Sequence, residues 1–101
     1  MVLTKKEKSN FINIIKKELS IFREINKIIL FGSFLKSNNP NDIDIAIIQD
    51  SKENYLTLSL RYRKVLRDLS KKIPIDIIPI KNNNNGVFLD EINKGNIVYE
   101  R

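Results

Sequence analysis

The sequence predicts an α/β or α+β domain in which helices flank a small mixed β-sheet. Two segments repeat apolar residues at the three- and four-residue spacing of an amphipathic helix, and short apolar runs rich in isoleucine alternate with them. With 101 residues, of which 42% are hydrophobic and 30% charged, the chain is long enough for one hydrophobic core and too short for two. We therefore expect residues 1–101 to form a single domain.

The first part of the chain predicts a helix, a strand and one helical turn. Residues 4–24 are expected to be helical, with Thr4 as the N-cap and Glu7 completing a capping box. The apolar stripe of this helix consists of Phe11, Ile14, Ile15, Leu19 and Phe22. Residues 27–31 predict a buried strand that ends at Gly32, and a helical turn over residues 33–37 and a loop over residues 37–41 follow.

The remainder predicts two strands separated by a helix, then a short helix and a last strand. Residues 42–48 alternate as a strand does, which places three isoleucines on one face and Asp42 and Asp44 on the other. Residues 52–72 repeat with the helical period, and residues 73–80 form a strand whose two prolines indicate an edge position or strand ends. Residues 87–95 predict a short helix closed by Gly95, and residues 96–100 a short strand.

The composition restricts the chemistry that this chain can perform. The sequence contains no cysteine and no histidine, which excludes disulfides, thiolate zinc sites, a cysteine nucleophile and an imidazole base. Catalysis would have to use carboxylates, hydroxyls, lysines, arginines and a hard metal ion. The net charge of +6 suits a polyanionic partner or a phosphate-bearing substrate, and equally a lysine-rich surface that maintains solubility. The sequence has no membrane-spanning run and no secretory signal, so we expect a cytoplasmic protein that does not contact a membrane.

Two apolar strands carry acidic residues that a purely structural strand does not need. Asp42 and Asp44 are two residues apart on a strand, so their side chains point the same way, roughly 6.5 Å apart along the chain. Asp76 is a second case, because it lies in the centre of the strand at residues 73–80. Such residues are often exposed on an edge strand. If the two strands are neighbours, however, the three carboxylates converge into a site that can hold one or two Mg²⁺ ions, and two ions would suit phosphoryl transfer.

Gly32 and Ser33 follow the first apolar strand and precede these acids. A glycine at a strand end lets the backbone approach a ligand closely, and a serine at the next helical turn can bind phosphate oxygens. A Gly-Ser pair alone is usually only a turn. The ordered set is more specific: a strand ending in Gly-Ser, an Asp-x-Asp strand, a helix, and a strand with a central Asp.

This ordered set resembles the minimal nucleotidyltransferases (MNT) of the DNA polymerase beta superfamily. The residues that carry the resemblance are Gly32, Ser33, Asp42, Asp44 and Asp76, and the C-terminal run FLDEINKGNIVYE is also similar to that family. Many relatives have a longer segment between the serine and the first aspartate, which includes an Arg-Gly pair. Here residues 34–41 span this segment, and Lys36 falls near that pair without the bidentate geometry of arginine.

The resemblance implies a nucleotidyltransferase fold and transfer of a nucleoside monophosphate, AMP from ATP, to an acceptor hydroxyl with release of pyrophosphate. It implies that Asp42, Asp44 and Asp76 are the catalytic and metal-binding residues, with Asp76 assisting as a base. Gly32, Ser33 and Lys36 would bind the nucleotide phosphates.

Because this module uses the whole chain, we expect a second polypeptide or a second copy to supply the acceptor. The family implies a helical HEPN-type partner, with this chain as the antitoxin of a toxin–antitoxin pair. Two alternatives remain open at this stage. One is an inactive antitoxin that neutralises its partner by binding alone, and the other is a small nucleic-acid-binding domain.

Overall fold

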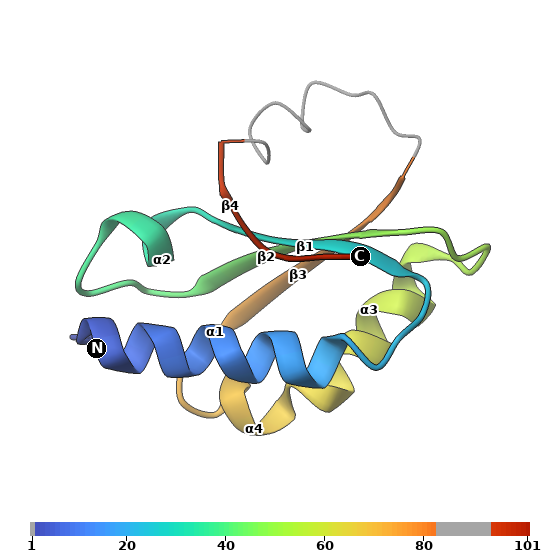
Figure 1. The fold of residues 1–101 in the computed structure, drawn as a ribbon. Helices are drawn as coiled ribbons and strands as arrows, with labels where there is room; N and C mark the ends of the chain where they lie inside the picture. The colour runs from blue at the N-terminus through green and yellow to red at the C-terminus, as the bar shows by residue number, and fades with distance from the viewer. Residues whose placement is uncertain (1, 83–93) are drawn as a thin grey trace.

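The computed structural model describes residues 2–82 and 94–101, which form a mixed four-stranded sheet with helices packed against one face (Figure 1). The strands lie in the order β3-β2-β1-β4. Strand β1 (Ile25–Phe31) is antiparallel to β2 (Ile43–Gln49) and to β4 (Asn96–Glu100), whereas β3 (Ile75–Lys81) is parallel to β2. The predicted fold class is therefore confirmed.

Helix α1 (Lys5–Leu19) starts as predicted and ends earlier than predicted. Thr4 accepts a hydrogen bond from the Glu7 backbone, and the Glu7 side chain accepts one from the Thr4 N–H, so the capping box is complete. The prediction that the helix continues to residue 24 is wrong, because β1 already begins at Ile25 and the chain needs the intervening residues to turn. Phe22, predicted on the helical stripe, instead packs edge-on against Tyr62 with ring centroids 5.4 Å apart.

The single helix predicted over residues 52–72 is two helices, α3 (Tyr55–Val65) and α4 (Arg67–Ser70). The Asn54 side chain accepts a hydrogen bond from the Thr57 N–H at 2.8 Å, and this cap delays the start of α3. The chain leaves helical geometry at Leu66, where φ is −101° and ψ is 13°. This kink keeps Leu66 and Leu69 both buried under the sheet.

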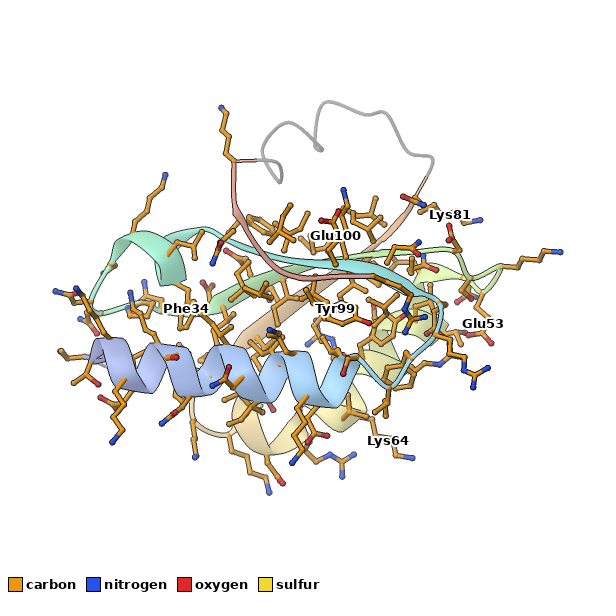
Figure 2. The ribbon with its side chains drawn as sticks, in the orientation of Figure 1. Phe34, Glu53, Lys64, Lys81, Tyr99 and Glu100 are labelled. Carbon is orange, nitrogen blue, oxygen red and sulfur yellow. The ribbon has the colours of Figure 1, made fainter. Side chains whose placement is uncertain are left out.

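The main core lies between the sheet and the helices. Strand residues on the helix-facing side include Ile28, Leu30, Ile45 and Ile77, all at most 2% exposed. Phe34 of the one-turn helix α2 (Ser33–Lys36) and Tyr99 of β4 also lie between the sheet and α1 (Figure 2). Burying side chains of this size contributes about 2 kcal/mol each relative to leaving them exposed, so this layer holds the elements together.

The opposite face of the sheet carries a second, smaller cluster and the acidic residues. The cluster consists of Ile29, Ala46, Ile48 and Ile80, with Phe31 and Ile78 packed against it. Because side chains alternate along a strand, Asp44 and Asp76 share this face with the cluster. The sheet therefore presents its carboxylates on the side away from α1 and α3.

Strand β3 is an edge strand, as its prolines predicted. The Pro74 carbonyl accepts a hydrogen bond from the Ile43 N–H at 2.9 Å, so the alternate residues 75, 77 and 79 direct their backbone groups to the outer edge. Pro79 has no N–H to leave unpaired there. The helix predicted over residues 87–95 lies outside the described residues. No helix in residues 2–82 and 94–101 is long and apolar enough to cross a membrane.

Candidate active site

Three aspartates converge at one end of the sheet. Asp44 on β2 and Asp76 on β3 are direct neighbours in the parallel register, and Asp42 immediately precedes β2. Each of the three offers one carboxylate oxygen, and these oxygens all lie within 4.8 Å of one another. The site predicted from the sequence required β2 and β3 to be neighbours, and the structure contains this pairing.

The three carboxylates differ in their exposure and in their electrostatics. Asp76 is exposed, whereas Asp42 and Asp44 are half-buried. Burial, followed by repulsion from Asp42 and Asp76 and a hydrogen bond with Asp76, raises the pKa of Asp44 from 3.8 to about 6. At neutral pH the site therefore concentrates negative charge in a place where each charge is partly desolvated.

The donor set suits a hard divalent cation. All of its ligand atoms are carboxylate oxygens, which Mg²⁺ prefers to nitrogen or sulfur donors. A cation among these oxygens would also offset the repulsion that raises the pKa of Asp44. Both the chemistry of the donors and the electrostatics of the cluster are therefore consistent with a magnesium site.

Gly32 lies against the carboxylate of Asp44. Its φ is +80°, the only positive φ among the described residues, and its backbone follows Phe31, which pairs with Asp44 in the β1–β2 register. A Cβ atom at position 32 would overlap Asp44 Oδ2 and lie 3.3 Å from Cγ. A glycine is needed here for two reasons, the backbone conformation and the space that the carboxylate occupies.

Ser33 and Lys36 belong to the short helix α2 that begins directly after Gly32. Ser33 is half-buried and directly follows Gly32, which lies against Asp44, and Lys36 is exposed. Lys36 and Gly32 line a small cavity of about 160 Å³ together with Lys94, which precedes β4. The structure thus places all six residues predicted for the site at this end of the sheet.

Lys94 was not predicted as a site residue. It reaches the cavity because β4 pairs antiparallel with β1, with Asn96 opposite Leu30, so that the start of β4 lies beside the end of β1. The only sequence signal was a lysine directly before a short apolar strand. Without knowledge of which strand β4 would pair with, that signal could not be connected with Gly32.

Lys8 was also missed, and it supports the loop between Ser33 and Asp42. Its Nζ donates a hydrogen bond to the Ser37 carbonyl at 2.6 Å and lies 5.5 Å from the ring centroid of Phe34. Phe34 stacks against Phe11, with centroids 6.4 Å apart. The start of α1 therefore braces α2, whose first residues follow Gly32.

Comparison with known proteins identifies the family to which this arrangement belongs. The family described as "Polymerase beta, Nucleotidyltransferase" matches residues 13–101, whereas a search of curated protein sequences gives no match.

Solved toxin–antitoxin structures share the fold. A chain from the complex of tri-AMPylated Shewanella oneidensis HEPN toxin with MNT antitoxin is 20% identical, with a TM-score of 0.71 over 93% of this chain and 73% of that one. A chain from a toxin–antitoxin complex with AMP-PNP is 20% identical, with a TM-score of 0.68 over 89% of this chain and 73% of that one. A chain from the MntA–HepT complex is 15% identical, with a TM-score of 0.60 over 97% and 74%. With the family match spanning most of its length, the chain belongs to the polymerase beta nucleotidyltransferase family.

Proposed function

We propose that this protein is a magnesium-dependent nucleotidyltransferase that transfers AMP from ATP to a hydroxyl group of a partner protein. The observation that carries the proposal is the convergence of Asp42, Asp44 and Asp76 on one face of the sheet, directly beside Gly32. Three adjacent carboxylates do not stabilise a β-sheet, because their negative charges repel one another. A nucleotidyl transfer site requires such a cluster.

Each site residue has a distinct part in the proposed reaction. Asp42 and Asp44 would hold both Mg²⁺ ions, and Asp76 would complete the site of one of them. When bound, the ions would neutralise charge on the triphosphate and polarise the reacting oxygens. Gly32, Ser33 and Lys36 would bind the terminal phosphates through backbone N–H groups, a hydroxyl and an ammonium group.

Asp76 is suited to the proton transfer because it is exposed and therefore accessible to an incoming acceptor. The acceptor hydroxyl oxygen forms a bond to the α-phosphorus, the bond from that phosphorus to pyrophosphate breaks, and the hydroxyl proton passes to Asp76. Alignment of the two oxygens supplies much of the rate enhancement in such reactions. The carboxylates lie on two rigid neighbouring strands, which favours this alignment.

The acceptor in this proposal is a helical HEPN-type toxin, for which the chain acts as the antitoxin. The support is the shared fold with chains from toxin–antitoxin complexes, one of which contains tri-AMPylated HEPN toxin and MNT antitoxin. Another contains AMP-PNP, an analogue of ATP.

The test is transfer of labelled AMP from ATP to a HEPN-type partner in the presence of Mg²⁺. We expect the wild type to label the partner, and Asp42→Asn, Asp44→Asn and chelation by EDTA each to reduce labelling at least about a hundredfold. Asp68→Asn is the matched control, because Asp68 is exposed on α4 and forms an ion pair at 3.8 Å with Lys71, which is also exposed. Equal labelling by the wild type and by Asp44→Asn would disprove the proposal.

A second candidate is an antitoxin that neutralises its partner by binding alone. It is favoured by the short segment between Ser33 and Asp42, in which the exposed Lys36 stands near the position of the relatives' arginine. If a folded triple Asp→Asn variant neutralises the toxin as fully as the wild type does, binding alone accounts for the function. Loss of neutralisation with retained complex formation would favour catalysis.

A further inference from the structure

A groove of about 400 Å³ lies on the outer side of strand β3, away from the carboxylates. Ile75 and Ile77 form one wall, and residues of α3 and α4, including Leu60, Arg63 and Arg67, form the other. No acidic side chain in the described part of the chain lines it. The groove therefore combines an apolar floor with a basic rim.

The exposed surface of α3 and the start of α4 beside this groove is divided into an apolar half and a basic half. Leu56 and Leu60 are 66% and 60% exposed and lie one helical turn apart. Arg63 and Lys64 follow on the next turn of α3, Arg67 is the first residue of α4, and all three are exposed. Large exposed leucines in adjacent turns are uncommon on a surface that contacts only water.

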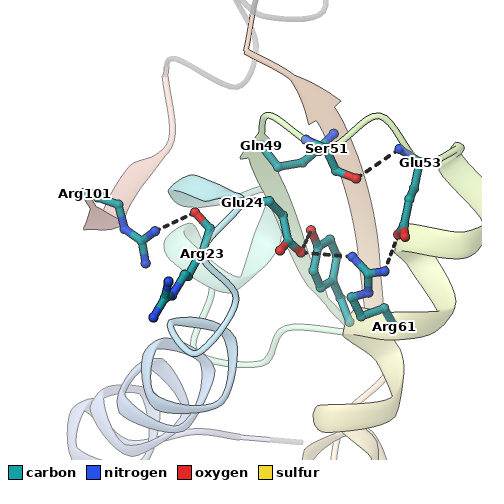
Figure 3. Close-up of polar contacts among 8 residues, drawn as sticks. Arg23, Glu24, Gln49, Ser51, Glu53, Arg61 and Arg101 are labelled. Carbon is teal, nitrogen blue, oxygen red and sulfur yellow. Dashed lines mark hydrogen bonds and ion pairs between the residues drawn. The ribbon is translucent and has the colours of Figure 1, made fainter.

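The three cationic side chains at the groove differ from Arg61, which forms ion pairs within the fold. Arg61 pairs with Glu24 at 3.2 Å and also with Glu53 (Figure 3). Among the ion pairs between described residues, none involves Arg63, Lys64 or Arg67. Their charge is thus available to a partner of opposite sign.

The edge of β3 beside the groove is unsuited to pairing with another strand. The Ile75 carbonyl accepts a hydrogen bond from Arg63 and the Ile77 carbonyl one from Tyr55, both at 3.4 Å. Pro79 has no N–H group to donate at this edge. A segment that enters the groove is therefore expected to bind as a helix, through side chains.

We propose that this groove docks an acidic amphipathic helix of a partner protein. Its apolar side chains would contact Leu56, Leu60 and the isoleucine wall, and its carboxylates would face Arg63, Lys64 and Arg67. Nucleic acid fits this surface less well, because the charged phosphate backbone has no apolar groups that could pack against Leu56, Leu60 and the isoleucine wall. The docking itself is independent of the proposed reaction.

Docking at this position would also hold the partner close to the carboxylates. Ile75 and Ile77 line the groove, and Asp76 lies between them on the opposite face of the same strand. A helix in the groove is thus separated from the carboxylate cluster by one edge strand. If the proposed nucleotidyl transfer holds, the groove is where the acceptor protein is gripped.

The probe is a fluorescein-labelled synthetic helical peptide with leucines at one end of a face and glutamates at the other. We expect micromolar binding in fluorescence anisotropy, weakened about tenfold or more by Arg63→Glu/Lys64→Glu/Arg67→Glu. The matched control is Lys5→Glu/Lys6→Glu/Lys16→Glu, which changes the net charge equally at exposed positions of α1 and should alter affinity less than about twofold. Leu60→Ser should weaken binding about fivefold, because it removes an apolar contact without changing the charge.

The double variant Lys64→Glu/Arg67→Glu retains the Arg63 bond to Ile75 and should still lose most of the affinity. Circular dichroism and thermal melts of every variant establish that it is folded. The proposal is overturned if no peptide binds at millimolar concentration, if the α1 control loses as much affinity as the groove variant, or if a lysine-bearing version of the peptide binds equally. Preferential, salt-sensitive binding of oligouridine that the groove variant abolishes would also overturn it, by assigning the groove to nucleic acid. AMP labelling is not the readout, so failure here is distinguishable from failure of the proposed reaction.

Discussion

At the scale of single residues, Asp44 opposes folding in the absence of a cation. Its folded pKa of about 6 exceeds the ordinary 3.8, so the folded protein binds a proton more readily than the unfolded chain. The free energy of unfolding therefore falls as the pH rises from about 4 to about 6, and this destabilisation persists at higher pH. After discounting for solvent screening of a half-buried group, it amounts to about 1 kcal/mol at neutral pH.

We predict that Asp44→Asn stabilises the metal-free protein at pH 7.5 while removing activity. The variant should gain about 1 kcal/mol, because the amide keeps the shape of the carboxylate without its charge. The gain should disappear below pH 4, where Asp44 is protonated in both states. Chemical denaturation with EDTA across this pH range measures the effect, with Asp68→Asn as the exposed control. Addition of Mg²⁺ should raise the melting temperature of the wild type and have less effect on Asp44→Asn. A destabilised Asp44→Asn would contradict this prediction.

Gly32→Ala is predicted to damage both stability and the site. The new Cβ would overlap Asp44 Oδ2 at a backbone φ of +80°, which L residues rarely adopt. We expect a loss of about 2 kcal/mol or more in the free energy of unfolding. Activity should fall at least about tenfold, because Asp44 must move. Gly95→Ala makes the same substitution across the same cavity without a positive φ, and it should have the smaller effect on both measurements.

At the scale of elements, α1 determines the position of α2 through Lys8. Lys8→Met keeps a long aliphatic side chain and removes the ammonium group, with its 2.6 Å bond to the Ser37 carbonyl and its position 5.5 Å from the Phe34 ring centroid. We expect a loss of about 1 kcal/mol in stability and, in the proposed nucleotidyl transfer, a rise of several-fold in KM for ATP with a smaller change in kcat. Lys5→Met, at an exposed position of the same helix, should change neither. An unchanged KM for Lys8→Met would show that α2 does not need this brace.

Helix α3 is joined to the turn before β1 by a buried tyrosine. Tyr62 is fully buried and donates its hydroxyl to Glu24 at 2.9 Å, beside the Arg61–Glu24 ion pair. Burial, followed by the bond to Glu24, raises the pKa of Tyr62, so the phenol remains a donor throughout the working pH range. Tyr62→Phe should cost about 1.5 kcal/mol because it removes a hydrogen bond to a charged group.

Tyr55→Phe is the matched control for Tyr62→Phe on the same helix. Tyr55 as a whole residue is 57% exposed, and the hydrogen bond from its hydroxyl to the Ile77 carbonyl is long, at 3.4 Å. Its removal should change stability by less than about 0.5 kcal/mol. Equal effects of the two substitutions, measured by urea denaturation, would contradict a special role for the Tyr62–Glu24 bond.

At the scale of the whole molecule, we predict that the chain unfolds as one cooperative unit. A single core cluster includes residues from α1, β1, β2, α3, α4 and β3, so no element can leave without exposing the others. Far-UV circular dichroism, which reports the backbone, and the fluorescence of the three tyrosines should give coincident thermal transitions. Two separate transitions would contradict the expectation of a single domain over residues 1–101.

Local sequence patterns predicted the order of the described strands, the faces of the strands and five of the six candidate site residues, because periodicity and turn residues act over a few positions, whereas Lys36 followed only from the family resemblance. They failed at the C-terminal end of α1, at the start of α3, which the Asn54 cap determines, and at the break between α3 and α4, where Leu66 and Leu69 are both buried. Strand order was decided only by the tertiary structure. It places Asp76 beside Asp44, Lys94 near Gly32, and Ile75 and Ile77 along the basic groove. The physical reason is that strand order depends on non-local contacts. The order that forms is the one that buries the apolar faces of all strands and helices together, and no local run of residues contains that information.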